Sequence, residues 1–146
     1  VRRPMVALRA SLDRLDIAAE ADIAGLEPLV EAAVAAAMII AHADGKVDLT
    51  ERRRIIALFR AAPLLQGFSA DDIAREIASH SRAFELDYAS ALTQATAQIS
   101  ATELSPEQFR ALIAMCISVL EADGVRHPSE EHALASISAM RPWGDR

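Results

Sequence analysis

Apolar side chains recur along the chain at the three- and four-residue spacing of amphipathic helices, and this periodicity predicts about seven helices. The pattern is clearest where a hydrophobic stretch begins at a capping residue or stops at a proline. Ser69 and Ser105 are the expected N-caps of two helices, and Pro63 is expected to end another. The predicted helices cover residues 5–15, 28–43, 49–61, 69–83, 87–100, 106–122 and 128–140.

Two of the predicted helices, 28–43 and 106–122, are apolar on nearly every side. A helix without a polar face is normally buried, so both are expected at the centre of a bundle, with Ile39 and Ile117 in the core. The chain is divided accordingly into two parts. Residues 1–27 form an N-terminal segment with a short helix and a loop near Gly25, and residues 28–146 form a helical domain.

Composition supports an all-α fold in a single domain. The 146 residues fit one domain with a real core. Aromatic residues make up only 4% of the chain, and there are 5 glycines and 6 prolines. This mixture, dominated by Ala, Leu, Ile and Val, favours helices over strands.

The net charge and the cysteine content limit the kinds of binding partner and the cellular location that we expect. The formal charge of −6 argues against nucleic acid as a partner and favours a metal or a cationic partner. The single cysteine, Cys116, cannot form an internal disulfide, which fits a cytoplasmic protein. The apolar run at residues 28–41 is interrupted by Glu31 and is shorter than the roughly 20 residues of a membrane-spanning helix. No signal peptide and no membrane insertion are therefore expected.

One motif occurs twice, about half the chain apart. The first copy reads AHADGKVDLTERR and the second reads EADGVRHPSEEHAL. In each copy an apolar helix ends at Ala-Asp-Gly, and a glutamate follows seven residues after the aspartate. Asp44 pairs with Glu51, and Asp123 pairs with Glu130. The chain is therefore predicted to contain an internally duplicated helix-loop-helix around its two apolar helices.

Ordinary signals that end one helix and begin the next explain much of this motif. Gly45 and Gly124 stand where a helix commonly ends in a residue of positive φ. Glu51 and Glu130 fall in the first turns of the following helices, where an acid is favourable. Asp44 is harder to explain, as is Asp123 in the second copy. Each lies at the negative end of a helix macrodipole, which costs a few tenths to about 1 kcal/mol, so a compensating cation is expected.

The EF-hand is the nearest calcium-binding pattern, and neither loop satisfies it alone. When Asp44 and Gly45 take the fifth and sixth places of that loop, the first place holds Ile40 rather than an acid. Val119 occupies the same place in the second copy. A calcium site would therefore have to be built from both loops together.

The two segments, each at the end of an apolar helix, resemble the signature segments of the TerB-like family, named for bacterial tellurite resistance. The resemblance implies an all-helical fold with internal duplication, a cytoplasmic role in stress and metal resistance, and no enzymatic reaction. Similar domains occur in membrane-anchored J-domain co-chaperones. Carried onto this chain, the family's acidic positions are Asp44, Glu51, Asp123 and Glu130. The chain departs from the family pattern at Arg126 and His127, where positive charge stands beside the second corner.

Other titratable residues are either candidate ligands or surface groups. His42 and His127 lie close to the two aspartates in sequence, so a mixed nitrogen and oxygen site for zinc or another transition metal stays open. His80 and His132 are interpreted as surface residues. The basic run is interpreted as a solvated face balanced by nearby carboxylates; it comprises Arg52, Arg53, Arg54 and Arg60. The acids at the start of the fourth helix are interpreted as a favourable first turn; they are Asp71, Asp72 and Glu76.

Two non-enzymatic functions follow, because no nucleophile motif, phosphate loop or cysteine ligand set is present. In the first, Asp44 and Asp123 are the principal ligands of a divalent ion and Glu51 and Glu130 complete the site. Calcium is preferred, with zinc or another transition metal as the alternative. In the second, the acidic corner is an interaction module that docks a basic segment of a membrane-associated resistance complex or a chaperone partner.

Overall fold

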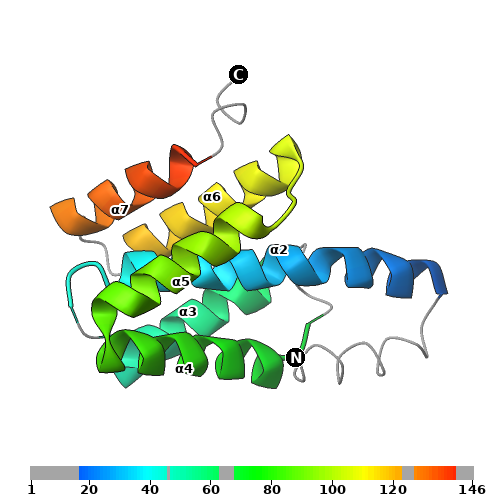
Figure 1. Ribbon diagram of the computed structural model, residues 1–146. Helices are drawn as coiled ribbons and strands as arrows, with labels where there is room; N and C mark the ends of the chain where they lie inside the picture. The colour runs from blue at the N-terminus through cyan, green and yellow to red at the C-terminus, as the bar shows by residue number, and fades with distance from the viewer. Residues whose placement is uncertain (1–16, 46, 63–67, 123–126, 141–146) are drawn as a thin grey trace.

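The computed structural model describes residues 17–45, 47–62, 68–122 and 127–140, and the chain is helical throughout these ranges apart from short connections (Figure 1). No strand occurs in them, which confirms the all-α class. The helix predicted for residues 5–15 lies outside the described part. The described helices are α2 (Ile17–Ala41), α3 (Leu49–Ala61), α4 (Ala70–Leu86), α5 (Tyr88–Ala101), α6 (Pro106–Glu121) and α7 (Pro128–Ser138).

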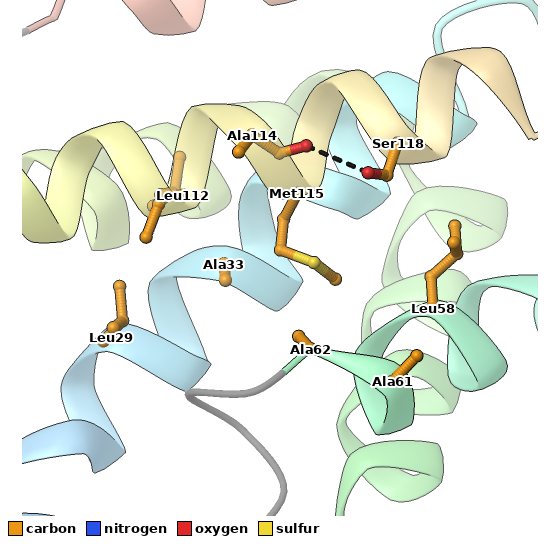
Figure 2. A pocket seen from close by; sticks show the side chains of 10 residues that line it. Leu29, Ala33, Leu58, Ala61, Ala62, Leu112, Ala114, Met115 and Ser118 are labelled. Carbon is orange, nitrogen blue, oxygen red and sulfur yellow. Dashed lines mark hydrogen bonds between the residues drawn. The ribbon is translucent and has the colours of Figure 1, made fainter.

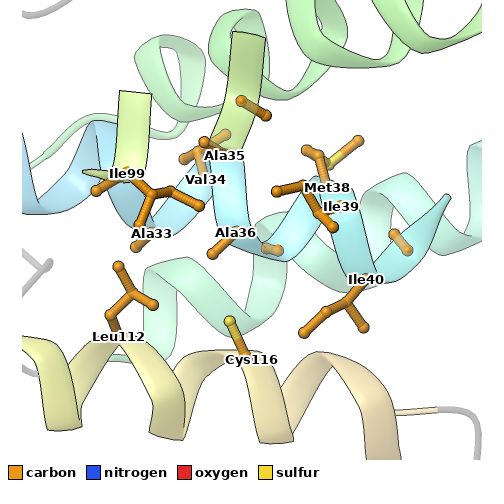
Figure 3. Close-up of a cluster of buried hydrophobic side chains, with 14 of the residues drawn as sticks. Ala33, Val34, Ala35, Ala36, Met38, Ile39, Ile40, Ile99, Leu112 and Cys116 are labelled. Atoms are coloured by element: carbon orange, nitrogen blue, oxygen red, sulfur yellow. The ribbon is translucent and has the colours of Figure 1, made fainter. Parts of the chain in front are cut away.

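Helix α2 is the centre of the bundle. In Figure 1, α6 and α7 lie above it, α3 and α4 lie below it, and α5 crosses in front of it. Every residue from Leu29 to His42 is buried except Glu31. Many of these residues are alanines, whose small side chains allow neighbouring helices to approach α2 from several directions. Figure 3 shows the result: Ile99 of α5 packs on one side of α2, and Leu112 and Cys116 of α6 pack on the other.

The start of α2 differs from the prediction. The helix begins at Ile17 rather than at residue 28, and it continues through Gly25 and Pro28. In a helix interior these residue types cost about 1 and 3 kcal/mol relative to alanine, which is why a loop is expected there from sequence. The surrounding residues are mostly alanine, leucine, isoleucine and glutamate, and the tight burial from Leu29 onward holds the helix in place. The boundary predicted between residues 27 and 28 therefore falls inside a helix.

Helix α6 is only partly enclosed, so the expectation of two central helices is half correct. Its buried residues are Phe109, Leu112, Cys116 and Leu120. The predicted core residue Ile117 is 37% exposed, whereas Ile39 of α2 is 4% exposed. An apolar composition does not by itself distinguish an enclosed helix from one that leaves an apolar face uncovered, and α6 is of the second kind.

The helix starts follow the capping residues closely. The Asp48 side chain caps α3 and the Ser105 side chain caps α6, each in a reciprocal capping box, and Ser69 caps α4. The first turn of α4 is acidic, as predicted, through Asp71 and Asp72, and both Asp72 and Glu76 are buried. Two acidic side chains therefore lie on the same buried side of α4 as its apolar residues.

Cys116 behaves as the small hydrophobe that its sequence context indicates. It is fully buried against α2, and burial raises the pKa of its thiol to about 12. The thiolate, which is the reactive form, is therefore almost absent at neutral pH.

Among the described helices, none has the combination of length and apolar character that crossing a bilayer requires.

Removal of a large side chain from α2 should be costly. We expect Ile39→Ala to lower the free energy of unfolding by about 2 to 5 kcal/mol, because it leaves a cavity in a fully packed region. Leu86 is 80% exposed, so Leu86→Ala should change stability by less than about 0.5 kcal/mol. Urea denaturation followed by circular dichroism measures both. Equal effects of the two substitutions would contradict the central position of α2.

Candidate metal site

The first corner is the turn that follows α2. The backbone N–H of His42 donates to the Met38 carbonyl at 3.0 Å, and the N–H of Gly45 donates to the His42 carbonyl at 3.1 Å. Gly45 has a φ of +129°, which confirms the positive value predicted for it. A Cβ at this position would meet no atom within 4 Å, so backbone conformation rather than space selects glycine. Gly124, the second predicted corner glycine, lies outside the described residues.

The start of α3 fixes the other side of this corner. The backbone N–H of Glu51 donates to Asp48 Oδ1 at 2.8 Å, and the N–H of Asp48 donates to Glu51 Oε1 at 3.5 Å. Val47 is 2% exposed and anchors the connection in the core. The carboxylate of Glu51 therefore helps to cap its own helix, which agrees with the interpretation of Glu51 as a first-turn acid.

The second corner brings His127 beside Asp44. His127 is the N-cap of α7, but its side chain makes no capping hydrogen bond. Its backbone carbonyl instead accepts from the N–H groups of Glu130 and Glu131, both at 3.0 Å. The imidazole extends toward the first corner, and its Nε2 lies 3.7 Å from Asp44 Oδ2. Asp123, the predicted principal ligand of this corner, lies outside the described residues.

Three side chains from the two corners converge on one region. Asp44, His127 and Glu130 each offer one ligand atom, and these atoms all lie within 4.8 Å of one another. Asp44 is exposed, His127 is half-buried and Glu130 is 7% exposed. Around a tetrahedral zinc ion, ligand atoms at about 2.1 Å from the metal are about 3.4 Å apart, so a modest contraction would complete three bonds. The fourth position would be left to water or to a further ligand.

Glu51 lies beside this group but is not part of it. Together with Glu130 and Arg54 it lines a cleft of about 20 Å³ between α3, α6 and α7. That volume is enough for about one water molecule. Arg54 also places a fixed positive charge in the wall of this cleft, next to two acids. Of the four predicted ligands, the structure thus brings Asp44 and Glu130 together and places Glu51 at the neighbouring cleft.

The alternative ligand His42 is directed into the core. It is 3% exposed, and its Nε2 lies 3.1 Å from the Ser81 hydroxyl. Its ring stacks on Phe84 with centroids 4.8 Å apart, and Phe84 in turn meets Tyr88 edge to face. Burial lowers the pKa of His42, against an opposing contribution from the carboxylate of Glu85. His42 therefore ties the end of α2 to α4.

The remaining histidines and arginines of interest lie as follows. His132 is exposed, as predicted, and His80 is half-buried. Arg52 contacts Glu85 of α4 at 3.5 Å, while Arg53 and Arg60 are exposed. The basic run is therefore divided among an ion pair, a cleft wall and solvent.

A sequence model of one protein family, described as tellurite resistance protein TerB, matches residues 30–140. This range extends from α2 beyond the end of α7 and includes both corners. No curated protein and no solved structure matches the chain.

Substitution of Gly45 should strain the first corner. We expect Gly45→Ala to lower the free energy of unfolding by about 1 to 3 kcal/mol, because an L-residue rarely adopts a φ of +129°. Urea denaturation of the metal-free protein measures the loss. A loss below about 0.5 kcal/mol would mean that the corner does not depend on glycine.

The buried His42 should make the fold sensitive to mild acid. Because its pKa is lower in the folded protein than the usual 6.5, the unfolded chain binds a proton first as pH falls through that range. Stability should therefore decrease below about pH 6.5, until pH reaches the folded pKa, and then level off. The variant His42→Gln should lose this component of the pH dependence.

The measurement is urea denaturation across pH 5 to 7.5, a window about one unit or more to either side of the usual histidine pKa. His132→Gln removes an exposed histidine and is the matched control, expected to keep the wild-type pH profile. Identical profiles for wild type and His42→Gln would contradict a role for the burial of His42.

Proposed function

The chain belongs to the TerB family of tellurite resistance proteins, and we propose that it serves this role as a non-catalytic protein that binds a divalent metal ion between its two corners. The proposal rests on one observation: Asp44, His127 and Glu130 converge although they come from opposite halves of the chain. The ion would link the end of α2 to the start of α7. Cys116, a buried thiol without a disulfide, is consistent with a cytoplasmic location.

The chemistry of the three ligands favours zinc or another transition metal. A neutral imidazole nitrogen suits these ions, whereas calcium takes six to eight oxygen ligands. Calcium is preferred from sequence alone because the four predicted ligands are all carboxylates. His127 changes this preference, since it occupies a position among the ligands that an all-oxygen site would need. A calcium site would require Glu51 and Asp123 to join Asp44 and Glu130.

Electrostatics supports a cation at this point. Asp44 follows the C-terminal end of α2, where the macrodipole is negative, and its carboxylate lies near that of Glu130. Two carboxylates in close proximity repel each other, and a divalent ion removes the repulsion. Arg54 lines the same cleft as Glu130 and offsets part of the negative charge there.

The second candidate function is a docking surface for a basic segment of another protein. Its support is a hydrophobic side chain at the same corner: Leu49 is 58% exposed and directly follows the exposed acid Asp48. An acidic surface with an apolar contact suits a basic partner with apolar side chains. Such a surface would function without any metal.

Calorimetric titration of the metal-free protein with zinc, manganese, magnesium and calcium distinguishes the two. We expect zinc to bind, and Asp44→Asn, His127→Asn and Glu130→Gln each to weaken binding at least about tenfold. Glu103→Gln removes an exposed acid from the connection between α5 and α6 and should leave the affinity unchanged. No ion-dependent heat in the wild type would defeat the metal proposal and favour the docking surface.

Thermal unfolding gives an independent readout. An ion that binds only the folded state should raise the Tm, and a chelator should reverse the rise. Asp44→Asn should remove this response while leaving the metal-free protein as stable or slightly more stable, since it removes an anion from the negative end of α2. Loss of stability in the metal-free variant would mean that Asp44 has a structural role instead.

A further inference from the structure

Most of the exposed large hydrophobic side chains gather at one end of the bundle. Among the described residues they are Leu49, Leu86, Tyr88 and Ile117. The first three belong to the start of α3, the end of α4 and the start of α5, which meet at the left-hand end of the bundle in Figure 1. We call Leu49, Leu86 and Tyr88 the apolar end patch. Clustered apolar side chains at a surface commonly mark a place where a partner binds.

An ion pair joins two of the elements that form this patch. Arg52 of α3 contacts Glu85 of α4 at 3.5 Å. Leu49 lies one turn before Arg52 on α3, and residues three apart on a helix are neighbours on its surface. Leu86 directly follows Glu85. Leu49 and Leu86 therefore lie near the same ion pair, although they are far apart in the sequence.

The turn between α4 and α5 holds Leu86 and Tyr88 in fixed positions. Asp87 ends the first of these helices and caps the second, because its backbone N–H donates into the last turn of α4 at 3.0 Å and its side chain accepts from the N–H of Ser90 at 3.1 Å. The ring of Tyr88 packs edge to face on Phe84, with centroids 5.3 Å apart. A surface that is already ordered loses little conformational freedom on binding, which favours association.

Two exposed aspartates border the apolar end patch. Asp48 precedes Leu49, and Asp87 stands between Leu86 and Tyr88. Each aspartate side chain caps the start of a helix, yet it remains at the surface with its negative charge. The patch is therefore apolar with an acidic border.

The arginines of α3 and α4 leave this acidic border largely uncompensated. Arg53 and Arg82 are exposed, but each lies four residues, about one helical turn, farther from the end of the bundle than the patch residue of its helix. Arg52 is engaged with Glu85. A partner that meets the end of the bundle therefore encounters apolar side chains and negative charge together.

We propose that the apolar end patch docks a basic segment of a partner protein that also carries apolar side chains. Lysines or arginines of the segment pair with Asp48 and Asp87, and its apolar side chains cover Leu49 and Leu86. Tyr88 is of the residue type that most often contributes strongly to binding at protein interfaces. The inference rests on the second candidate function above, and it assigns that function to a surface formed by α3, α4 and α5 together.

The negative charge of the border argues against two other occupants. A second copy of the chain, docked patch to patch, would bring Asp48 and Asp87 of each molecule close to those of the other, and like charges facing each other oppose association. An anionic bilayer would be repelled for the same reason, since such surfaces attract basic segments. A basic protein segment is the occupant that satisfies both the charge and the apolar area.

The largest hollow on the described surface lacks this charge selectivity. It is an apolar groove of about 360 Å³ between α2, α3 and α6 (Figure 2). Ser118 is the one polar residue among the described residues that line it, and its hydroxyl donates to the Ala114 carbonyl at 3.1 Å. No charged side chain is among them, so the groove does not distinguish a basic partner from any other apolar one.

Three fluorescent peptides of equal length test the chemistry of the partner. The first is built of lysine and leucine, the second has glutamate in place of every lysine, and the third has serine in place of every leucine. In anisotropy titrations of the full chain with a chelator present, we expect the lysine and leucine peptide to bind with a Kd below about 100 μM. The other two should bind at least about tenfold more weakly, because each lacks one half of the complementarity. Amide NMR shifts on binding should be largest at residues 47–53 and 84–90.

A charge variant tests the acidic border without removing the helix caps. Asp48→Asn combined with Asp87→Asn removes two charges, and asparagine caps a helix about as well as aspartate does. This variant should bind the lysine and leucine peptide at least about tenfold more weakly. Glu103→Gln combined with Glu107→Gln removes two exposed acids near the connection between α5 and α6 and is the matched control, expected to keep the wild-type affinity.

An apolar variant tests the patch itself. Leu49→Ser combined with Leu86→Ser should weaken binding of the same peptide at least about tenfold. Ile117→Ser removes an exposed apolar side chain from α6 and should leave the affinity unchanged.

Several results would overturn the docking inference. They are no binding of the lysine and leucine peptide up to about 1 mM, equal weakening by the control variants, shift changes centred outside the patch, and equal binding of the glutamate peptide or of anionic vesicles. A chain that binds zinc but not the peptide would contradict this inference alone. A chain that binds the peptide but not zinc would contradict the metal proposal alone.

Discussion

The enclosure of α2 is the constraint on which the rest of the structure depends. A helix buried along most of its length from Leu29 to His42 needs neighbours on all sides, and α4, α5, α6 and α7 all contact it. Its alanines keep those neighbours close, because a larger side chain at the same positions would force them apart. Because α2 is enclosed from Leu29 onward, the chain reaches solvent again only after the end of this helix. The first corner forms at that point. The candidate metal site is a consequence of this exit point, since α7 packs on α2 and its N-terminus reaches the same place.

Ordinary helix-ending chemistry positions the candidate ligands. Gly45 turns the chain through a positive φ, and Asp48 and Glu51 cap the next helix. His42 is held by Ser81 and by stacking on Phe84, which fixes the last turn of α2 against α4. Asp44 follows this fixed turn and is exposed rather than buried. His42, which resembles a ligand by its place in the motif, is thus a structural support. His127, whose side chain makes no capping hydrogen bond, would supply the nitrogen ligand of the proposed site.

Local signals in the sequence predict most helix boundaries well. They fail where packing between helices determines where a helix begins or which of its faces is buried. Capping residues such as Ser69 and Ser105 determine helix starts through contacts within a few residues, so they are readable from sequence. The start of α2 is not, because the burial of its later turns outweighs the local cost of Gly25 and Pro28. The exposure of Ile117 is similarly invisible, since composition does not reveal which apolar face lacks a neighbour. The repeated motif indicates Asp44 and Glu130, and the sequence also leaves both His42 and His127 open as ligands. Which histidine joins the carboxylates cannot be read from sequence, because that depends on how α7 packs on α2.

The two carboxylates of the candidate site are not equivalent, although the motif makes them look alike. Glu130 lies in the first turn of α7, where the positive end of the macrodipole stabilises an anion, and it is 7% exposed. Asp44 follows the negative end of α2 and is exposed to water. A metal ion would therefore relieve more unfavourable energy at Asp44 than at Glu130, while Glu130 would provide the ligand that is already held in place. Binding energy and positional rigidity would come from different halves of the chain, so the ion would couple the end of α2 to the start of α7.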